Sequence, residues 1–107
     1  MPKTGLERRW GGGCEDPCEN DMRAALAELD TPDDEHPSCW LTDENGWALS
    51  AYQSGLVIFE SLAKGEGPWH LKNQTYDQVI ELWRLLQLGE IEKIRNRPWQ
   101  NGYGCNA

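Results

Sequence analysis

Residues 38–62 read SCWLTDENGWALSAYQSGLVIFESL, and this stretch decides the fold. Asn45-Gly46 is a strong signal for a tight hairpin, because both central residues of a type I′ turn need a positive φ. Ser54-Gly55 offers a second tight turn further along. The apolar residues on either side of the two turns favour strands. We therefore expect an antiparallel β-meander, to which WHLKN (69–73) adds a short edge strand, giving three to four strands.

The register of this meander follows from the length of its loops. With two residues in each loop, Trp40 lies opposite Ala51, and Ala51 lies opposite Ile58. This register puts Trp40 on one face together with Trp47, Leu49 and Leu62. It puts a second apolar set on the other face: Leu41, Tyr52, Val57 and Phe59. Since both faces are apolar, the alternation does not say which one is buried.

Helical patterns stand on both sides of the meander. Residues 21–29 have apolar residues on one helical face, with Asp21 as the cap. Residues 76–88 form the stronger pattern, because Thr75 and Gln78 make a capping box. A second short helix begins in GEIEKIRNR (89–97). The segregation of strands and helices predicts an α+β fold: a short N-terminal helix, the meander, and a C-terminal helix or broken helix pair packed on one sheet face.

The first twenty residues differ in character from the rest of the chain. Residues 1–20 contain three consecutive glycines at 11–13, two prolines and few apolar side chains. Such a composition favours a flexible tail that becomes ordered only through a metal or a partner. We therefore expect a tail over residues 1–20 and one small α+β domain over residues 21–107.

Acidic residues are concentrated in the first half of the chain. The formal net charge is −8, and residues 1–46 hold twelve acidic and four basic residues, whereas residues 47–107 hold six of each. This balance argues against nucleic acid and anionic membranes as partners, because both are bound through clustered Lys and Arg. It favours a basic protein partner, although acidic charge also serves solubility alone.

Tryptophan is the second unusual feature, with six residues in 107. Trp83, on the apolar stripe of the C-terminal helix, is expected in the core, whereas Trp10 and Trp69 lie in segments that are hard to bury. Exposed indoles near carboxylates are typical of protein-binding surfaces. The residues expected to contact the partner are Glu28, Asp30, Asp33, Asp34, Glu35, Asp43, Glu44 and Trp69.

Four side chains have a spacing that could bind zinc: Cys14, Cys18, His36 and Cys39. Two pairs of thiolate and imidazole ligands suit tetrahedral zinc. Against this, the first pair is not separated by the favoured two residues, and Cys39 stands where a strand begins. We expect no cofactor, and keep a zinc-stabilised interaction module as the alternative.

No catalytic motif is present, so we do not expect an enzyme. His70 is a lone histidine in an expected loop or edge strand, where exposure to solvent is the usual state. The sequence shows neither a secretory signal nor an apolar stretch of bilayer length. We therefore expect a cytoplasmic protein whose cysteines are reduced.

The run CWLTDENGWALSAYQSGLVIFE (39–60), GPWHL (67–71), TYDQVIELWRLLQLGEIEKI (75–94) and RPW (97–99) resembles small bacterial immunity proteins. The resemblance is to immunity proteins of polymorphic-toxin and contact-dependent inhibition systems, and it covers roughly residues 22–100. It implies a compact acidic domain that binds and blocks a cognate toxin, often a nuclease. Two alternatives remain: an enzyme whose site no motif identifies, and a structural homodimer.

Overall fold

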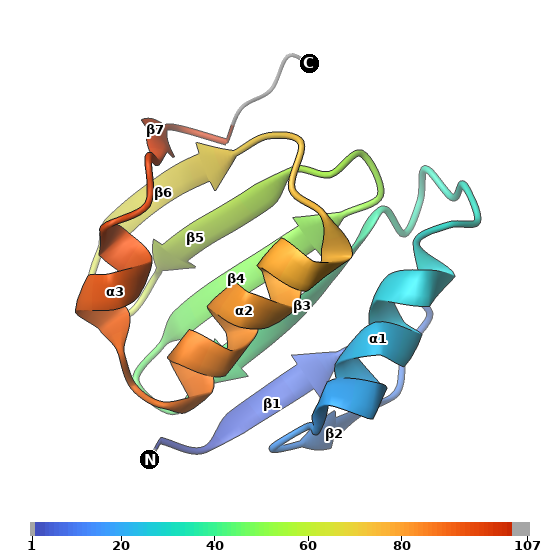
Figure 1. The fold of residues 1–107 in the computed structure, drawn as a ribbon, viewed down its shortest axis with the longest axis horizontal. Coiled ribbons are helices and arrows are strands. Elements are labelled where there is room, and N and C mark those ends of the chain that lie inside the picture. Colours follow the sequence, from blue (N-terminus) through green and yellow to red (C-terminus); the bar gives the residue numbers. More distant parts are fainter. Residues whose placement is uncertain (1, 104–107) are drawn as a thin grey trace.

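The computed structural model describes residues 2–103, which form one seven-stranded antiparallel sheet with three helices on one of its faces (Figure 1). The strand order is β2-β1-β3-β4-β5-β6-β7. The strands are β1 (Thr4–Glu7), β2 (Gly13–Glu15), β3 (Ser38–Asp43), β4 (Trp47–Tyr52), β5 (Val57–Ser61), β6 (Glu66–Leu71) and β7 (Gln100–Asn101). The helices are α1 (Glu19–Glu28), α2 (Tyr76–Gln87) and α3 (Ile91–Arg95). The expected α+β class is confirmed, with more strands than the three to four expected.

The first twenty residues are the largest difference from expectation. Within residues 2–20, β1 pairs with β3 and β2 pairs with β1, which places both strands in the sheet and not in the expected flexible tail. Leu6 is only 2% exposed. The glycines form a turn, in which Gly11 and Gly12 have positive φ. A Cβ at Gly13 would lie 1.9 Å from the Leu6 carbonyl oxygen, so this position requires glycine for close strand pairing.

The meander is present, but its register differs by one residue at each hairpin. Cys39 lies opposite Ala51, and Ala51 lies opposite Val57. The first loop has three residues (44–46). In the second, the Tyr52 N–H donates to the Leu56 carbonyl oxygen at 2.9 Å, which leaves three residues (53–55) in the turn. Each turn ends in a glycine with positive φ, at Gly46 and Gly55. A one-residue change of register moves side chains to the other face of the sheet. Trp40 therefore points away from the helices.

Asp43 explains why the first loop has three residues. Its Oδ1 accepts hydrogen bonds from the backbone N–H groups of Asn45 (3.0 Å) and Trp47 (2.9 Å). These bonds stabilise a turn that begins at Asp43 rather than at Glu44. The residue expected to bind a partner thus serves the turn, and its own exposure is 9%.

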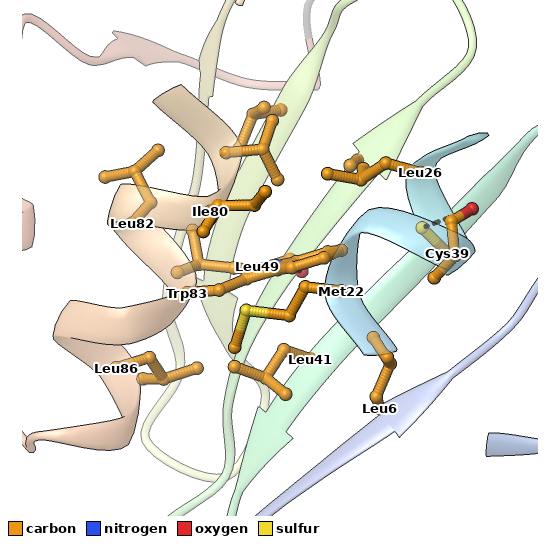
Figure 2. Packing of buried hydrophobic residues seen from close by; sticks show 14 of the residues in the cluster. Leu6, Met22, Leu26, Cys39, Leu41, Leu49, Ile80, Leu82, Trp83 and Leu86 are labelled. Carbon is orange, nitrogen blue, oxygen red and sulfur yellow. Dashed lines mark hydrogen bonds between the residues drawn. The ribbon is translucent and has the colours of Figure 1, made fainter. Parts of the chain in front are cut away.

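The core lies between the sheet and α1 and α2, and Trp83 is at its centre (Figure 2). The Trp83 side chain is fully buried, and its Nε1 donates to the Leu49 carbonyl oxygen at 2.9 Å. Met22 of α1 lies beside the indole in Figure 2, so the core joins both helices to β4. Burial of this many apolar groups is the main stabilising contribution to a domain of this size.

The helix boundaries follow their caps. Thr75 and Gln78 form the expected capping box at the start of α2, with Gln78 N donating to Thr75 Oγ1 at 3.2 Å. For α1 the cap is Cys18 rather than Asp21, and the Asp21 carboxylate accepts from the Cys18 N–H at 3.0 Å. Within residues 2–103, none of the helices has the length and apolar character that crossing a membrane requires.

Candidate protein-binding surface

The indoles divide into a packed group and an exposed pair. Four rings lie in or against the core: Trp47, Trp69, Trp83 and Trp99. Trp10 and Trp40 remain exposed, at 50% and 37%. Only this pair offers indole surface on the scale expected of binding residues.

Trp69 does not lie free on a loop as expected. It is part of β6, and its ring packs on Phe59 with 5.8 Å between ring centroids. The Arg95 guanidinium lies over the Trp69 ring, 5.8 Å from its centroid. Because these contacts fix a half-buried ring, Trp69 contributes to packing rather than to an open binding surface.

Arg9 organises the segment that connects α1 to β3. Arg9 is only 4% exposed, and its guanidinium donates a hydrogen bond to Gln53 Oε1 of the β4–β5 loop at 2.8 Å. Its guanidinium N–H groups also donate to four backbone carbonyl oxygens, those of Glu28, Thr31, Asp33 and His36. A buried guanidinium needs such acceptors, and charged donors make strong hydrogen bonds. Arg9 therefore holds the connecting segment to the sheet.

Trp10, next to Arg9, is held in place although it is exposed. Its Nε1 donates to Asp33 Oδ2, and the Arg9 guanidinium lies 4.8 Å from its ring centroid. Asp33 Oδ1 accepts from the backbone N–H groups of Glu35 (3.1 Å) and His36 (3.3 Å). These bonds, the Trp10 bond first, lower the pKa of Asp33. The indole and the acidic loop, which we define as residues 33–35, thus form one fixed unit.

Trp40 lies at the same end of the sheet. Glu7 is its neighbour on β1, and both point to the face without helices. Trp10 lies in the turn that follows β1, and the acidic loop precedes β3. Figure 1 shows the end of β1 and the start of β3 at the same end of the sheet. We define the acidic tryptophan surface as Glu7, Trp10, Asp34, Glu35 and Trp40, all of them exposed.

The other predicted binding acids have structural partners or lie elsewhere. Glu28 pairs with Arg8 at 2.7 Å, and Asp30 accepts a hydrogen bond from the Tyr76 hydroxyl. Asp43 and Glu44 lie at the opposite end of β3, where Glu44 accepts from the Lys3 backbone N–H at 3.2 Å. Asp34 and Glu35, by contrast, have no ion-pair partner among the described residues. The predicted set therefore divides, and only its loop members adjoin the exposed indoles.

The four candidate zinc ligands are not brought together. Cys18 Sγ lies 3.2 Å from Asp21 Oδ2, while the His36 ring pairs with Asp33 at 3.3 Å. Cys39 is fully buried under α1, and this burial raises the pKa of its thiol to about 12, against the thiolate that a metal requires. Within the described part of the chain, no three His, Cys, Asp or Glu side chains are arranged to hold a metal ion.

His70 is buried in β6 rather than exposed in a loop, with 5% exposure. Its Nδ1 lies 2.9 Å from the Gly102 carbonyl oxygen, so β7 and the following turn cover it. This contact fixes the imidazole. Among the described residues, no nucleophile and no carboxylate lies at hydrogen-bond distance from the His70 ring. A catalytic arrangement would need one of these.

Three members of the surface were not in the predicted partner-binding set: Glu7, Trp10 and Trp40. Trp10 was expected only to be hard to bury. Glu7 lies in the segment expected to be a tail, and Trp40 was placed opposite Ala51 by the two-residue loops. Asp43 at the start of the first loop is the sequence signal that would have corrected the register of Trp40. No protein-family model, no curated protein and no solved structure matches this chain.

Proposed function

We propose that this protein binds a basic partner protein and blocks it, in the manner of an immunity protein, through the acidic tryptophan surface. One observation carries the proposal: the two exposed indoles lie at the end of the sheet that also presents Asp34 and Glu35. The other indoles pack in or against the core. Among an inhibitor, a zinc-stabilised module and a structural homodimer, the inhibitor is the function that these paired features support.

The geometry suits tight binding because the surface is already ordered. Trp10 is fixed by its hydrogen bond to Asp33 and by the Arg9 guanidinium beside its ring. Ordering a large side chain on binding costs about 0.5–1.5 kcal/mol, and a fixed indole avoids much of that cost. Tryptophan is also one of the residues most often found at energetic centres of interfaces.

The charge suits a basic partner. Asp34 and Glu35 project without ion-pair partners among the described residues, and Glu7 adds a third carboxylate beside Trp40. Such a surface attracts a cationic partner during diffusion, which raises the association rate at low salt. Screening beyond about 10 Å at 0.1 M salt reduces that attraction. A cytoplasmic location is part of the same proposal.

The test measures binding to a basic toxin domain encoded beside this protein's gene, by surface plasmon resonance over a series of salt concentrations. We expect the association rate to fall as salt increases. Trp10→Ala and Trp40→Ala should each weaken binding roughly tenfold, as about 1.4 kcal/mol implies. The toxin's activity should be lost in the stoichiometric complex.

A charge-matched pair of variants separates this surface from net charge. Asp34→Asn with Glu35→Gln removes two carboxylates from the surface, whereas Glu44→Gln with Glu92→Gln removes two exposed carboxylates elsewhere. Only the first pair should slow association strongly. Equal effects of both pairs, or binding unaffected by Trp10→Ala and Trp40→Ala, would exclude this surface.

A further inference from the structure

A hollow of about 410 Å³ lies beside the acidic tryptophan surface. It is bounded by the end of α1, the connecting segment, the β4–β5 loop and the first residue of α2. Its lining residues are Leu29, Asp30, Pro32, Gln53 and Tyr76. The hollow adjoins the acidic loop, because Pro32 directly precedes Asp33 and the Asp33 N–H donates to Gln53 Oε1 at 3.0 Å.

Asp30 gives the hollow a fixed negative charge. The Tyr76 hydroxyl donates to Asp30 Oδ1 and so orients the carboxylate. Burial, followed by the hydrogen bond to Asp30, raises the pKa of Tyr76 from 10.0 to about 12, so the phenol stays a hydrogen-bond donor even at alkaline pH. Among the described residues, Asp30 has no ion-pair partner, so its second oxygen is available to a cation.

The walls of the hollow suit the aliphatic and planar parts of a side chain. Leu29 and Pro32 are apolar, and the half-exposed ring of Tyr76 offers an aromatic face. Gln53 is held on the inner side, because its Oε1 accepts from Arg9 Nη2 and from the Asp33 backbone N–H at 3.0 Å. Arg9 places a positive charge behind Gln53, but its N–H groups are directed at carbonyl oxygens and the hollow itself is lined by a carboxylate.

We infer that this hollow accepts an arginine side chain of the basic partner, with the guanidinium on Asp30 and the stem against Pro32 and Tyr76. The inference rests on the proposed function, because it specifies one contact of the same partner. Arginine fits better than lysine, since a planar guanidinium binds a carboxylate through two N–H groups and stacks on an aromatic ring. The contact deepens the interface next to Trp10.

The test uses N-acetyl-arginine amide as a probe, with N-acetyl-citrulline amide as its uncharged analogue, in ¹H–¹⁵N NMR titrations of the isolated protein. A probe of this size should bind with a dissociation constant on the order of millimolar. We expect shifts of the Asp30, Gln53 and Tyr76 signals with the arginine probe and much smaller shifts with the citrulline probe. Absence of these shifts, or equal shifts with both probes, overturns the inference.

Two substitutions localise the probe. Asp30→Asn keeps the shape of the hollow and should weaken arginine binding about tenfold. The control Glu44→Gln removes an exposed carboxylate at the opposite end of β3 and should change it less than twofold. Tyr76→Phe keeps the ring and removes the hydroxyl. Its loss of arginine affinity should lie between those of Asp30→Asn and the control variant. An unchanged thermal midpoint in each variant shows that folding is retained. Equal binding by Asp30→Asn and the unmodified protein overturns the inference.

The same variants separate this inference from the proposed function. If the toxin complex forms and depends on Trp10 but not on Asp30, the arginine contact is wrong and the proposed function stands. If the arginine probe binds at Asp30 but no basic partner binds the acidic tryptophan surface, the hollow stands as a guanidinium site and the proposed function is wrong.

Discussion

Two parts of the molecule are held together by different interactions. We call them the apolar side (α2, β4 and β5) and the polar side (β1, β2 and the segment connecting α1 to β3). Around α2, β4 and β5, the contacts are apolar: Trp83 is buried against Leu49, and Trp47 stacks on Phe59 with 4.7 Å between ring centroids. Around β1, β2 and the connecting segment, much of the contact is polar and centres on Arg9. The first part is held mainly by the packed core. The second shares that core through Leu6 and α1 and adds a hydrogen-bonded framework around a buried cation.

This difference places the candidate site. Apolar packing fixes side chains by taking them out of solvent, which leaves little to present to a partner. The Arg9 framework fixes backbone carbonyl groups instead, among them those of Asp33 and His36, which flank Asp34 and Glu35. The flanking side chains stay free to face solvent. Trp10, Asp34 and Glu35 are exposed and yet positioned for this reason. The polar side is thus the one suited to recognition.

The largest expected effect is that of Trp83→Ala. The substitution leaves a cavity at the centre of the core and removes the bond to the Leu49 carbonyl oxygen. We expect the free energy of unfolding to fall by about 3–5 kcal/mol, as for other large buried aromatic residues. Urea denaturation monitored by circular dichroism measures this, with Trp40→Ala as the exposed control. A loss below that of the control would contradict the position of Trp83 in the core.

The second effect is that of Arg9→Met, which tests the polar side. Methionine fills much of the volume but leaves four carbonyl oxygens and Gln53 without their donor. We expect a loss of about 2–4 kcal/mol, because unpaired buried polar groups are costly. Hydrogen exchange should increase over residues 29–37 and much less over α2. Uniform acceleration in both regions would show that the two sides do not differ as described.

The apolar side was largely predictable from sequence, since its signals are local. The Thr75–Gln78 capping box predicted where α2 begins, and the helical stripe placed Trp83 in the core. The hairpins were also visible, but their register was not, because a single hydrogen-bonding side chain, Asp43, selects a three-residue loop. Local patterns therefore predict where helices and strands lie better than they predict which residues pair across neighbouring strands.

The polar side was not predictable, because its order comes from distant partners. Glycine-rich residues 11–13 suggest a linker, and nothing near them shows that β1 pairs with β3. In the sequence, Arg9 has the character of an ordinary surface residue. Only the structure shows that four carbonyl oxygens of a distant segment accept its hydrogen bonds. The acidic loop was recognised as a binding candidate, but its relation to Trp10 depends on that same long-range contact.

Thr75→Ala should have a smaller effect, confined to the start of α2. It removes the side-chain acceptor of the Gln78 N–H. We expect a loss of about 1 kcal/mol, the usual value for such caps, and Thr75→Ser should restore most of it. Thermal unfolding followed by circular dichroism measures both. If serine does no better than alanine, the capping hydrogen bond is not the source of the effect.

The smallest effect expected is in the acid dependence of stability, and it concerns Asp33. Its carboxylate accepts from Trp10 and from two backbone N–H groups, which lower its pKa from the ordinary 3.8. A carboxyl whose pKa is lower in the folded state stabilises the protein above its ordinary pKa, and this contribution is lost as the pH falls through the folded value. Asp33→Asn should therefore be less stable than the unmodified protein at neutral pH.

The difference between the two proteins should narrow as the pH is lowered below 3.8. Urea denaturation at a series of pH values measures it, and Asp34→Asn serves as the control, because it removes the same charge without these hydrogen bonds. Curves for Asp33→Asn and the unmodified protein that stay parallel through this range would mean that the Trp10–Asp33 bond does not hold the loop in solution. The exposed indole would then be free to move, and the polar side would lose the order that makes it a candidate for recognition.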